Sequence, residues 1–318
     1  MAPVGTPRPA DLVHLKPSNG AGMLALAATA AATVAGVALA ARGEWLPWIT
    51  GQLILAVAFV QWFVILHECG HDTLFRTRTW NRVAGSVAGF FALIPFACWT
   101  RVHARHHRWT GWQDLDPTTE ALVPRNRGCV ERAVVNLCWK YWLPLFALTY
   151  RTLNYWHLPR LRAMFPNASA RWAITRDIGV LLSSYAGLAI LVGPRELIQL
   201  AGPAVALSLI VEDVLLLSQH THIPQQVSGG TTVKPFAAMD QEAFTRSLRL
   251  PAPASTLLLH FDAHELHHMY PYVPGYLLRR IPYRTGGEIG WWDWTRRARR
   301  VPGEVFLFQN RNESGFDV

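Results

Sequence analysis

Four long apolar runs divide the chain, at about 21–41, 45–66, 177–193 and 196–218. Each is close to the ~20 residues that an α-helix needs to cross the ~30 Å hydrocarbon core of a bilayer. The last two runs are separated only by Gly193-Pro194-Arg195, so they are expected to form an antiparallel hairpin. The pattern therefore predicts an all-α integral membrane protein with four transmembrane helices.

A shorter apolar stretch, 83–99, lies between two histidine-rich motifs at 67–71 and 103–107. A single crossing would place these motifs on opposite faces of the membrane. We therefore expect 83–99 to be interfacial or re-entrant, with Gly85, Gly89 and Pro95 permitting the bend. The aromatic stretch 133–156 is expected to lie along the membrane surface.

Polar tails are expected to flank one membrane domain. Residues 1–20 form a loose cytoplasmic tail in this interpretation, 21–275 the membrane domain, and 276–318 a basic cytoplasmic region. Ala38-Leu39-Ala40 resembles a signal-peptidase site. The apolar run before it exceeds the usual ~7–15 residues of a signal peptide, which favours a retained helix.

Composition strengthens the membrane prediction. The chain is 51% hydrophobic and 16% charged, whereas soluble domains are about 25% charged. Its net charge of +9 comes from arginines that flank apolar segments, which favours anionic lipid headgroups and disfavours a nucleic-acid partner. None of the four cysteines forms a C-x-x-C pair, so neither a zinc ribbon nor a disulfide framework is indicated.

The distribution of positive charge predicts the orientation. Arg42 and Arg195 lie in the two links between paired spans, and nearly all of the other Lys and Arg residues lie in the tails and remaining connections. By the positive-inside rule those segments are cytoplasmic. Every histidine motif then faces the cytoplasm, most simply at the cell inner membrane.

Eight of the 13 histidines fall into three short boxes. The boxes are His67-Glu-Cys-Gly-His71, His103-Ala-Arg-His106-His107 and His264-Glu-Leu-His267-His268. Spacings of three and four residues place side chains on one face of a helix. Neutral imidazole binds Fe, Cu, Zn and Ni, and eight nitrogens are too many for one ion. The boxes therefore predict a site with two metal ions.

Further histidines and carboxylates lie near the boxes. His222, one turn after Ser218, is the favoured additional ligand, and His220 is a possible one. Because metal-bound imidazoles usually donate their other N–H to a carboxylate or carbonyl, nearby acidic residues are expected to orient the ligands. They are Glu68, Asp72, Asp114, Asp116, Asp262 and Glu265, with Glu212 and Asp213 inside the last span and His260 as a further orienting candidate.

Together the boxes resemble the membrane fatty acid desaturase superfamily, over about His67 to Pro274. His67-Glu-Cys-Gly-His71 and Gln219-His-Thr-His222 are similar to stretches of acyl-lipid desaturases, as is His267-His-Met-Tyr-Pro271. The resemblance implies a non-haem site of two iron ions and O2 as co-substrate. It also implies a lipid or acyl-thioester substrate and electrons from a carrier such as ferredoxin or cytochrome b5 with its reductase. The eight box histidines are the iron ligands that the resemblance implies.

Three alternatives remain open. A hydroxylase, ketolase or acetylenase would use the same ligands. The first box also matches H-E-x-x-H, so a membrane zinc protease with Glu68 as general base is a distant alternative. A non-catalytic scaffold that keeps the metal for stability is the third.

Overall fold

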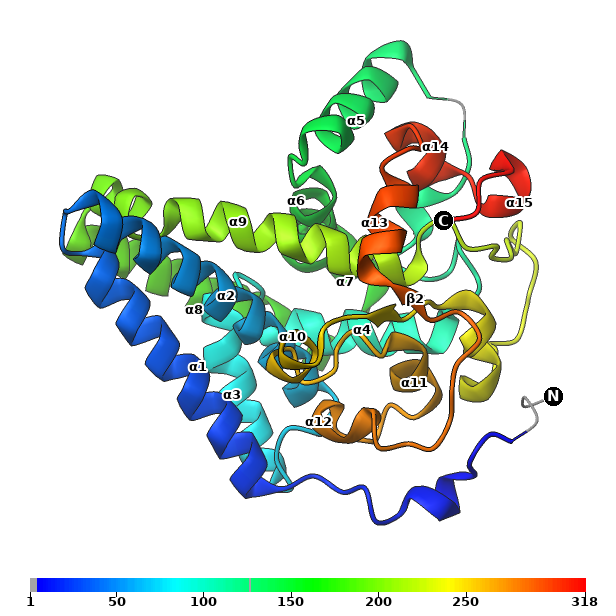
Figure 1. Ribbon diagram of the computed structural model, residues 1–318, viewed down its shortest axis with the longest axis horizontal. Coiled ribbons are helices and arrows are strands. Elements are labelled where there is room, and N and C mark those ends of the chain that lie inside the picture. Colours follow the sequence, from blue (N-terminus) through cyan, green and yellow to red (C-terminus); the bar gives the residue numbers. More distant parts are fainter. Residues whose placement is uncertain (1–4, 126) are drawn as a thin grey trace. The chain divides into compact units, whose positions relative to one another are not determined.

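The computed structural model describes residues 5–125 and 127–318. They form two compact units, which we describe separately. The span unit comprises 17–101 and 147–212, and the box unit comprises 5–16, 102–146 and 213–318. Two helices, α4 and α9, begin in the span unit and end in the box unit (Figure 1).

Helices make up most of the chain, and the only sheet among the described residues is a two-stranded parallel pair, in which Leu248 is opposite Ile289. The elements in chain order are η1 Pro9–Leu12, α1 Asn19–Ala40, α2 Trp45–Gly70, α3 Arg78–Phe91, α4 Phe96–Trp109, η2 Glu120–Leu122, α5 Cys129–Tyr141, α6 Leu145–Arg151, the π-helical turn η3 Thr152–Trp156, α7 Leu158–Met164, α8 Ala168–Val192, α9 Pro194–His220, η4 Ala238–Phe244, β1 Leu248–Arg249, α10 Ala252–Leu257, α11 His264–Met269, α12 Gly275–Leu278, β2 Ile289–Gly290, α13 Trp291–Ala298, α14 Gly303–Phe308 and α15 Arg311–Ser314.

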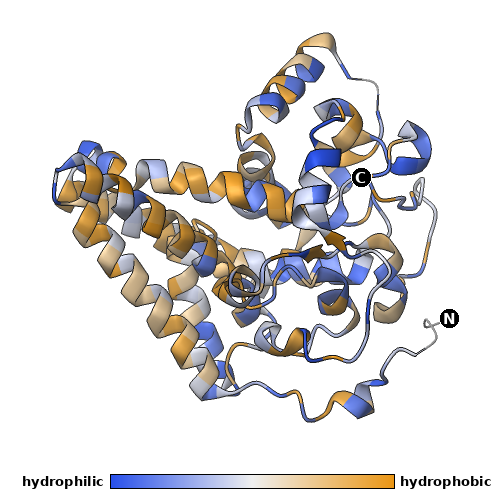
Figure 2. Cartoon of the chain, viewed as in Figure 1, coloured by the Kyte–Doolittle hydropathy of each residue, from blue (hydrophilic) through white to orange (hydrophobic). Residues whose placement is uncertain are grey.

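The four predicted spans are confirmed. Among the described residues, α1, α2, α8 and α9 are the helices long and apolar enough to cross a membrane individually. Figure 2 shows apolar residues along all four. Many of their large side chains are exposed, including Leu191 at 86%. Such exposure suits side chains that contact lipid tails rather than a protein core.

The first two spans pack closely side by side (Figure 1). A Cβ atom on Gly51 of α2 would lie 2.5 Å from the backbone nitrogen of Ala40 in α1, so only glycine permits this approach. Buried Trp62 of α2 donates its indole N–H to the hydroxyl of Thr33 in α1, at 2.9 Å. Small residues and interhelical hydrogen bonds are the usual contacts between helices in a membrane.

The stretch expected to be re-entrant is broken by a sharp bend. Helices α3 and α4 meet at 101°, across residues 92–95. Carbonyl groups left unpaired by such a break are costly in an apolar environment, so they need donors. Arg151 donates to the carbonyl of Ala92 and Trp156 to that of Leu93, and Tyr185 adds a donor to that of Phe90. The carboxylate of Asp177 accepts from the backbone N–H of Ala97 at the start of α4, at 2.9 Å.

A buried ion pair completes this cap. Arg151, which donates to the carbonyl of Ala92, also donates to the carboxylate of Glu212 in α9. Both side chains are buried. A lone buried charge is far more costly than a paired one, so Glu212 neutralises the arginine that caps the bend. The sequence predicts that Glu212 orients a metal ligand, whereas in the structure its carboxylate pairs with Arg151.

The box unit has two apolar clusters that include both ends of the described chain. Leu12 and Leu15 pack with Leu266, Met269 and other residues around α11. A second cluster includes Trp294, Phe306 and Val318. The segments expected to be a loose tail and a basic cytoplasmic region therefore contribute core residues, although Trp291, Trp292 and Phe316 stay exposed.

Substitution of the Arg151–Glu212 ion pair tests whether the two side chains stabilise the protein together. We expect Arg151→Met to destabilise the protein by about 3–5 kcal/mol, because it leaves the Glu212 carboxylate buried without its partner. The double variant Arg151→Met/Glu212→Met should be less destabilised than Arg151→Met alone, since no unpaired charge remains. Thermal unfolding in one detergent, followed by fluorescence-detected size exclusion, measures this. Additive losses in the double variant would contradict the coupling.

Candidate metal centre

The second and third boxes lie on helices of the box unit. Box 2 occupies the last two turns of α4, where its spacing places His103, His106 and His107 on one side. Box 3 forms the short helix α11, all six residues of which are buried. Polar side chains are rarely buried in such number without partners, so these imidazoles require a specific arrangement.

Four imidazoles converge in the box unit. One ring nitrogen from each of His106, His220, His264 and His268 lies within 4.8 Å of the other three. The Nε2 atom of His268 is 3.2 Å from that of His106 and 3.0 Å from that of His264. The Nε2 atoms of His220 and His264 are 2.8 Å apart. We call these four residues the four-histidine cluster.

The outer nitrogens of three of these rings face hydrogen-bond acceptors. His106 Nδ1 is 2.7 Å from a carboxylate oxygen of Asp116, and His220 Nδ1 is 3.3 Å from the carbonyl oxygen of Phe244. His268 Nδ1 is 2.8 Å from Oε1 of Gln241. Because carboxylate and carbonyl oxygens only accept, each Nδ1 donates, and in the neutral ring Nε2 then carries a lone pair.

The cluster therefore directs lone pairs at a common centre. Burial, reinforced by the neighbouring histidines, lowers the pKa of His268 well below its ordinary value, which keeps the ring neutral at physiological pH. Neutral imidazoles with inward lone pairs at about 3 Å repel one another unless a cation lies between them. The donor set suits iron, copper, zinc or nickel and contains no thiolate or carboxylate.

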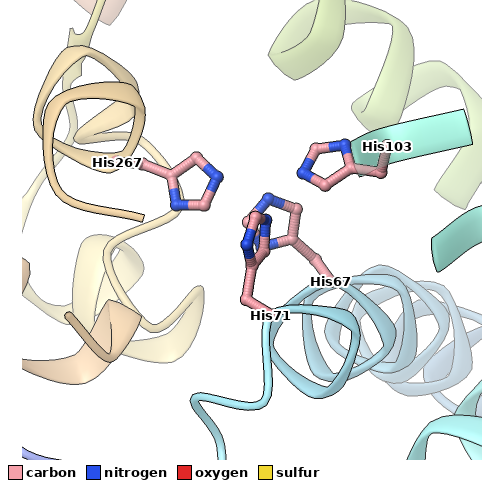
Figure 3. Close-up of side chains that lie close together, drawn as sticks. All are labelled: His67, His71, His103 and His267. Atoms are coloured by element: carbon pink, nitrogen blue, oxygen red, sulfur yellow. The ribbon is translucent and has the colours of Figure 1, made fainter. Parts of the chain in front are cut away.

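A second group of imidazoles lies in the same unit. His107 Nε2 is 3.1 Å from His103 Nε2 and 3.0 Å from His267 Nε2. His103 and His267 come from α4 and α11, and Figure 3 shows their rings. Boxes 2 and 3 thus each contribute to both groups: His106 and His107 are adjacent in the chain but direct their rings to different ones.

The first box lies at the end of α2 in the span unit. His67 belongs to the last turn and His71 follows the helix, with ring centroids 5.0 Å apart (Figure 3). Trp99 contacts both rings edge-on. A Cβ atom on Gly70 would lie 2.0 Å from the Trp99 ring, so the glycine in the box permits this contact. The apolar indole shields one side of the histidine pair.

Two of the predicted orienting carboxylates contact box histidines. Asp116 accepts from His106, as described above, and Glu68 Oε1 is 3.2 Å from His67 Nδ1. Glu68 also accepts from the hydroxyl of Thr73 at 2.9 Å, and its side chain is buried. Both carboxylates therefore have the geometry expected of groups that fix a ligand's tautomer.

The other predicted acidic residues have different contacts. Asp262 accepts from Ser255 and Arg279, and the same Ser255 hydroxyl is 2.8 Å from His260 Nδ1. Glu265 accepts from the backbone N–H groups of Ser247 and Gly287 and from Thr285. Asp114 accepts from Ser228 and Gly229, Asp72 is exposed beside Arg78, and Asp213 is half-buried on α9. Asp72, Asp114, Asp262 and Glu265 thus contact arginines, hydroxyl groups and backbone N–H groups.

The two histidines near the end of the last span are placed differently. His220 belongs to the four-histidine cluster, whereas His222 Nε2 lies 2.8 Å from Ser314 Oγ and 3.2 Å from the carbonyl of Phe316. Helix α9 ends at His220, and His222 has a left-handed backbone with φ of 63°. Helical spacing from Ser218 therefore does not extend to His222, and His220 rather than His222 belongs to the four-histidine cluster.

Arg246 holds the end of α9 that carries His220. The buried guanidinium donates to the carbonyls of Ser218 and Thr221, and to that of Val318 at 2.6 Å. Burial lowers the pKa of Arg246 to about 10, so the side chain remains charged at neutral pH. A charged donor satisfies carbonyls that the helix end would leave unpaired.

Two contacting residues had no signal in the sequence. Gln241 in η4 contacts His268, and the Thr118 hydroxyl lies 3.0 Å from His106 Nδ1. Neither is a charged group, and Gln241 lies 27 residues before His268 in the sequence. Only the folded chain brings it to α11.

Comparisons with known proteins agree with the boxes. The family model for fatty acid desaturases matches residues 43–290, which include all three boxes. A probable fatty acid desaturase, DES1, of Sorghum bicolor is 26% identical over 263 residues, covering 78% of this chain and 66% of that protein. A chloroplastic sn-2 acyl-lipid omega-3 desaturase (ferredoxin) of Helianthus annuus is 24% identical over 78% of this chain and 58% of its own length.

A shorter match is more similar locally. The sn-1 oleoyl-lipid 12-desaturase of a Picosynechococcus species is 31% identical over 94 residues, which are 30% of this chain and 27% of that protein. The matched part of the chain thus spans at most about two thirds of each of these three relatives. Because the family model covers more than half of the chain, with four membrane-spanning helices and the histidine groups already in place, the chain belongs to the fatty acid desaturase family.

Proposed function

We propose that this chain is an integral-membrane desaturase that uses two non-haem iron ions, O2 and external electrons to introduce a double bond into a fatty acyl or related lipid chain. The observation that carries this proposal is the four-histidine cluster, whose inward lone pairs require a cation. Membership of the desaturase family supports the substrate class, and the four spans support a lipid environment.

The proposed iron ligands are the eight box histidines together with His220. They are His67, His71, His103, His106, His107, His264, His267 and His268. For His67 and His71 the proposal rests on the box pattern and the family. Asp116, Gln241 and the carbonyl of Phe244 orient rings of the four-histidine cluster, and Glu68 orients His67.

Iron held by these histidines would supply the activation of O2 that removal of hydrogen from an unactivated C–H bond requires. The protein's residues hold the imidazoles neutral and oriented, and they keep bulk water from the buried rings. The reaction balances when one O2, two electrons and two protons convert –CH2–CH2– into –CH=CH– and two molecules of water. Electrons must therefore come from a donor outside the site.

We propose a lipid or acyl-thioester substrate and a small electron carrier as the partners. Ferredoxin and cytochrome b5 with its reductase are the two carriers that the family resemblance implies. Ferredoxin appears in the name of the Helianthus annuus relative, which supports it as the first carrier to test. Membrane lipids surround the spans and supply the hydrocarbon chain.

A hydroxylase, ketolase or acetylenase would bind the same metal ions, so product analysis distinguishes these outcomes from desaturation. The zinc-protease alternative requires Glu68 to act as a general base on metal-bound water. Glu68 is buried and its two oxygens contact His67 and Thr73. This arrangement favours a role in orienting His67 over one in proton transfer to water.

We also propose that the site faces the cytoplasm at the cell inner membrane. The support is the excess of Lys and Arg in the connections other than those containing Arg42 and Arg195. Arg171 and Arg176 lie near the start of α8, at the end of that helix proposed to be cytoplasmic.

Metal analysis is the first test. We expect purified wild-type protein to contain about two metal ions per chain, because so many imidazoles exceed the coordination of one ion. We expect these ions to be iron, with little zinc, because the desaturase resemblance implies iron. The iron content of His268→Ala should fall to about one ion per chain or fewer, since this variant lacks a ligand of the four-histidine cluster. His157→Ala, at an exposed histidine outside both groups, is the matched control. Zinc near one per chain would support the protease alternative instead.

Product analysis tests the reaction. Host membranes expressing the wild type should contain a lipid with two hydrogens fewer than its precursor, and His267→Ala should reduce it at least ~100-fold, because loss of a ligand costs more than loss of an orienting residue. Fatty-acid mass spectrometry measures both. A product heavier by one oxygen would identify a hydroxylase.

Side-specific labelling tests the orientation. Cys129 is exposed, whereas Cys69 and Cys98 are buried, so Cys129 can report its own side once Cys138 is replaced by alanine. In intact cells a membrane-impermeant maleimide should fail to label Cys129, but it should label Arg195→Cys in a Cys129→Ala/Cys138→Ala background. Inverted vesicles should give the opposite pattern. Labelling of Cys129 in intact cells would refute the cytoplasmic orientation.

A further inference from the structure

Gln241 connects boxes 2 and 3 through its side-chain amide. The residue lies in the 3-10 helix η4 and is 3% exposed. Its Nε2 donates to the backbone carbonyl of His107 at 2.7 Å, and its Oε1 lies 2.8 Å from His268 Nδ1. Both contacts are within the box unit.

These two bonds fix the direction of the amide. The carbonyl of His107 can only accept, so the amide nitrogen must face it and the amide oxygen must face His268. In the flipped amide, two oxygens would face each other at His107. Because the amide oxygen can only accept, His268 Nδ1 must donate the hydrogen. Gln241 therefore determines which nitrogen of His268 carries the proton.

The consequence is at the opposite side of the ring. With hydrogen on Nδ1, the neutral ring has its lone pair on Nε2, which lies 3.2 Å from the Nε2 of His106 and 3.0 Å from that of His264. The other tautomer would direct an N–H into the four-histidine cluster and would exclude a cation there. Gln241 thus selects the metal-binding tautomer without adding a charge, whereas Asp116 does so for His106 with a carboxylate.

The same amide relates the two histidine groups. The Nε2 atom of His107 is directed at His103 and His267, while its ring stacks on that of His268 with the centroids 4.3 Å apart. Gln241 holds the backbone of His107 on one side and the ring of His268 on the other. Its own backbone carbonyl accepts from the hydroxyl of Thr245, the residue after η4, at 3.0 Å, which holds Gln241 in place. The buried side chain of Gln241 therefore contacts one member of each histidine group, His107 and His268.

We propose that Gln241 is a positioning residue that sets the tautomer of His268 and holds the two metal-binding groups at a fixed separation. This inference rests on the proposed function, in which the four-histidine cluster binds a metal ion. It adds a residue of a type that neither the boxes nor nearby carboxylates would suggest.

Two substitutions separate this role from a purely architectural one. Gln241→Leu has a similar size and removes both hydrogen bonds. Gln241→Glu keeps an acceptor for His268 but places a second acceptor against the carbonyl of His107. If the amide serves only to attach η4 to α4, both variants lose that attachment and should bind metal equally poorly. Gln309→Leu, at an exposed glutamine, is the control.

The experiment is titration of the full-length protein in detergent with Fe(II), and with Co(II) as a spectroscopic probe, against a competing chelator. We expect the wild type and Gln309→Leu to bind about two ions. Gln241→Leu should bind one of the two metal ions with wild-type affinity and the other about 10–100-fold more weakly, which is the usual effect of removing a hydrogen-bond partner of a ligand. Gln241→Glu should bind the metal more tightly than Gln241→Leu does. The reduction potential of its bound iron should also be lower, because a carboxylate acceptor makes the His268 ligand more basic.

The outcomes distinguish the two proposals. Wild-type affinities for both ions in Gln241→Leu would overturn this inference and leave the proposed function intact. A folded Gln241→Glu that binds metal no better than Gln241→Leu would also overturn it. A wild type that binds neither Fe(II) nor Co(II) would overturn the proposed function, and this inference with it. Thermal unfolding of each variant identifies loss of folding. If Gln241→Leu does not fold, Gln241→Glu is compared with the wild type, and a loss of about 10-fold or more in either affinity would overturn the acceptor role.

Discussion

Mutual repulsion among buried imidazole lone pairs is the constraint on which this site depends. A neutral histidine has one donor and one acceptor nitrogen, so an inward lone pair requires an outward N–H with its own acceptor. The folded chain provides those acceptors to three rings through Asp116, Gln241 and the carbonyl of Phe244. Without them, rotation or a change of tautomer would relieve the repulsion, and the cluster would lose its preference for a cation.

Buried polar groups also need hydrogen-bond partners at the bend of the span unit. A break between α3 and α4 leaves carbonyl groups without helical donors in an apolar environment, and side chains from 151–185 supply them. One of those donors is charged, and Glu212 compensates it. The bend and the ion pair therefore form one structure: the bend needs Arg151, and Arg151 needs Glu212.

Hydrophobic length and helical spacing predicted what depends on local sequence. The span expected at 45–66 is Trp45–Gly70, and 196–218 is Pro194–His220, because length and apolarity largely determine whether a helix can cross a bilayer. Local spacing could not show that α9 ends at His220, since the left-handed turn at His222 is fixed by contacts with residues 314–316. Gln241 was missed for the same reason: its partners are 134 and 27 residues away.

The types of partner also bear on the chemistry. An all-imidazole donor set adds no negative charge, and of the three acceptors around the four-histidine cluster only Asp116 is an acidic side chain. A divalent ion there would keep most of its positive charge, in a buried environment where charges interact strongly. Such a site favours an anionic additional ligand more than a carboxylate-rich site would. Replacing neutral Gln241 by an ionised residue would reduce this preference, so its neutrality is as much a part of the site as its position.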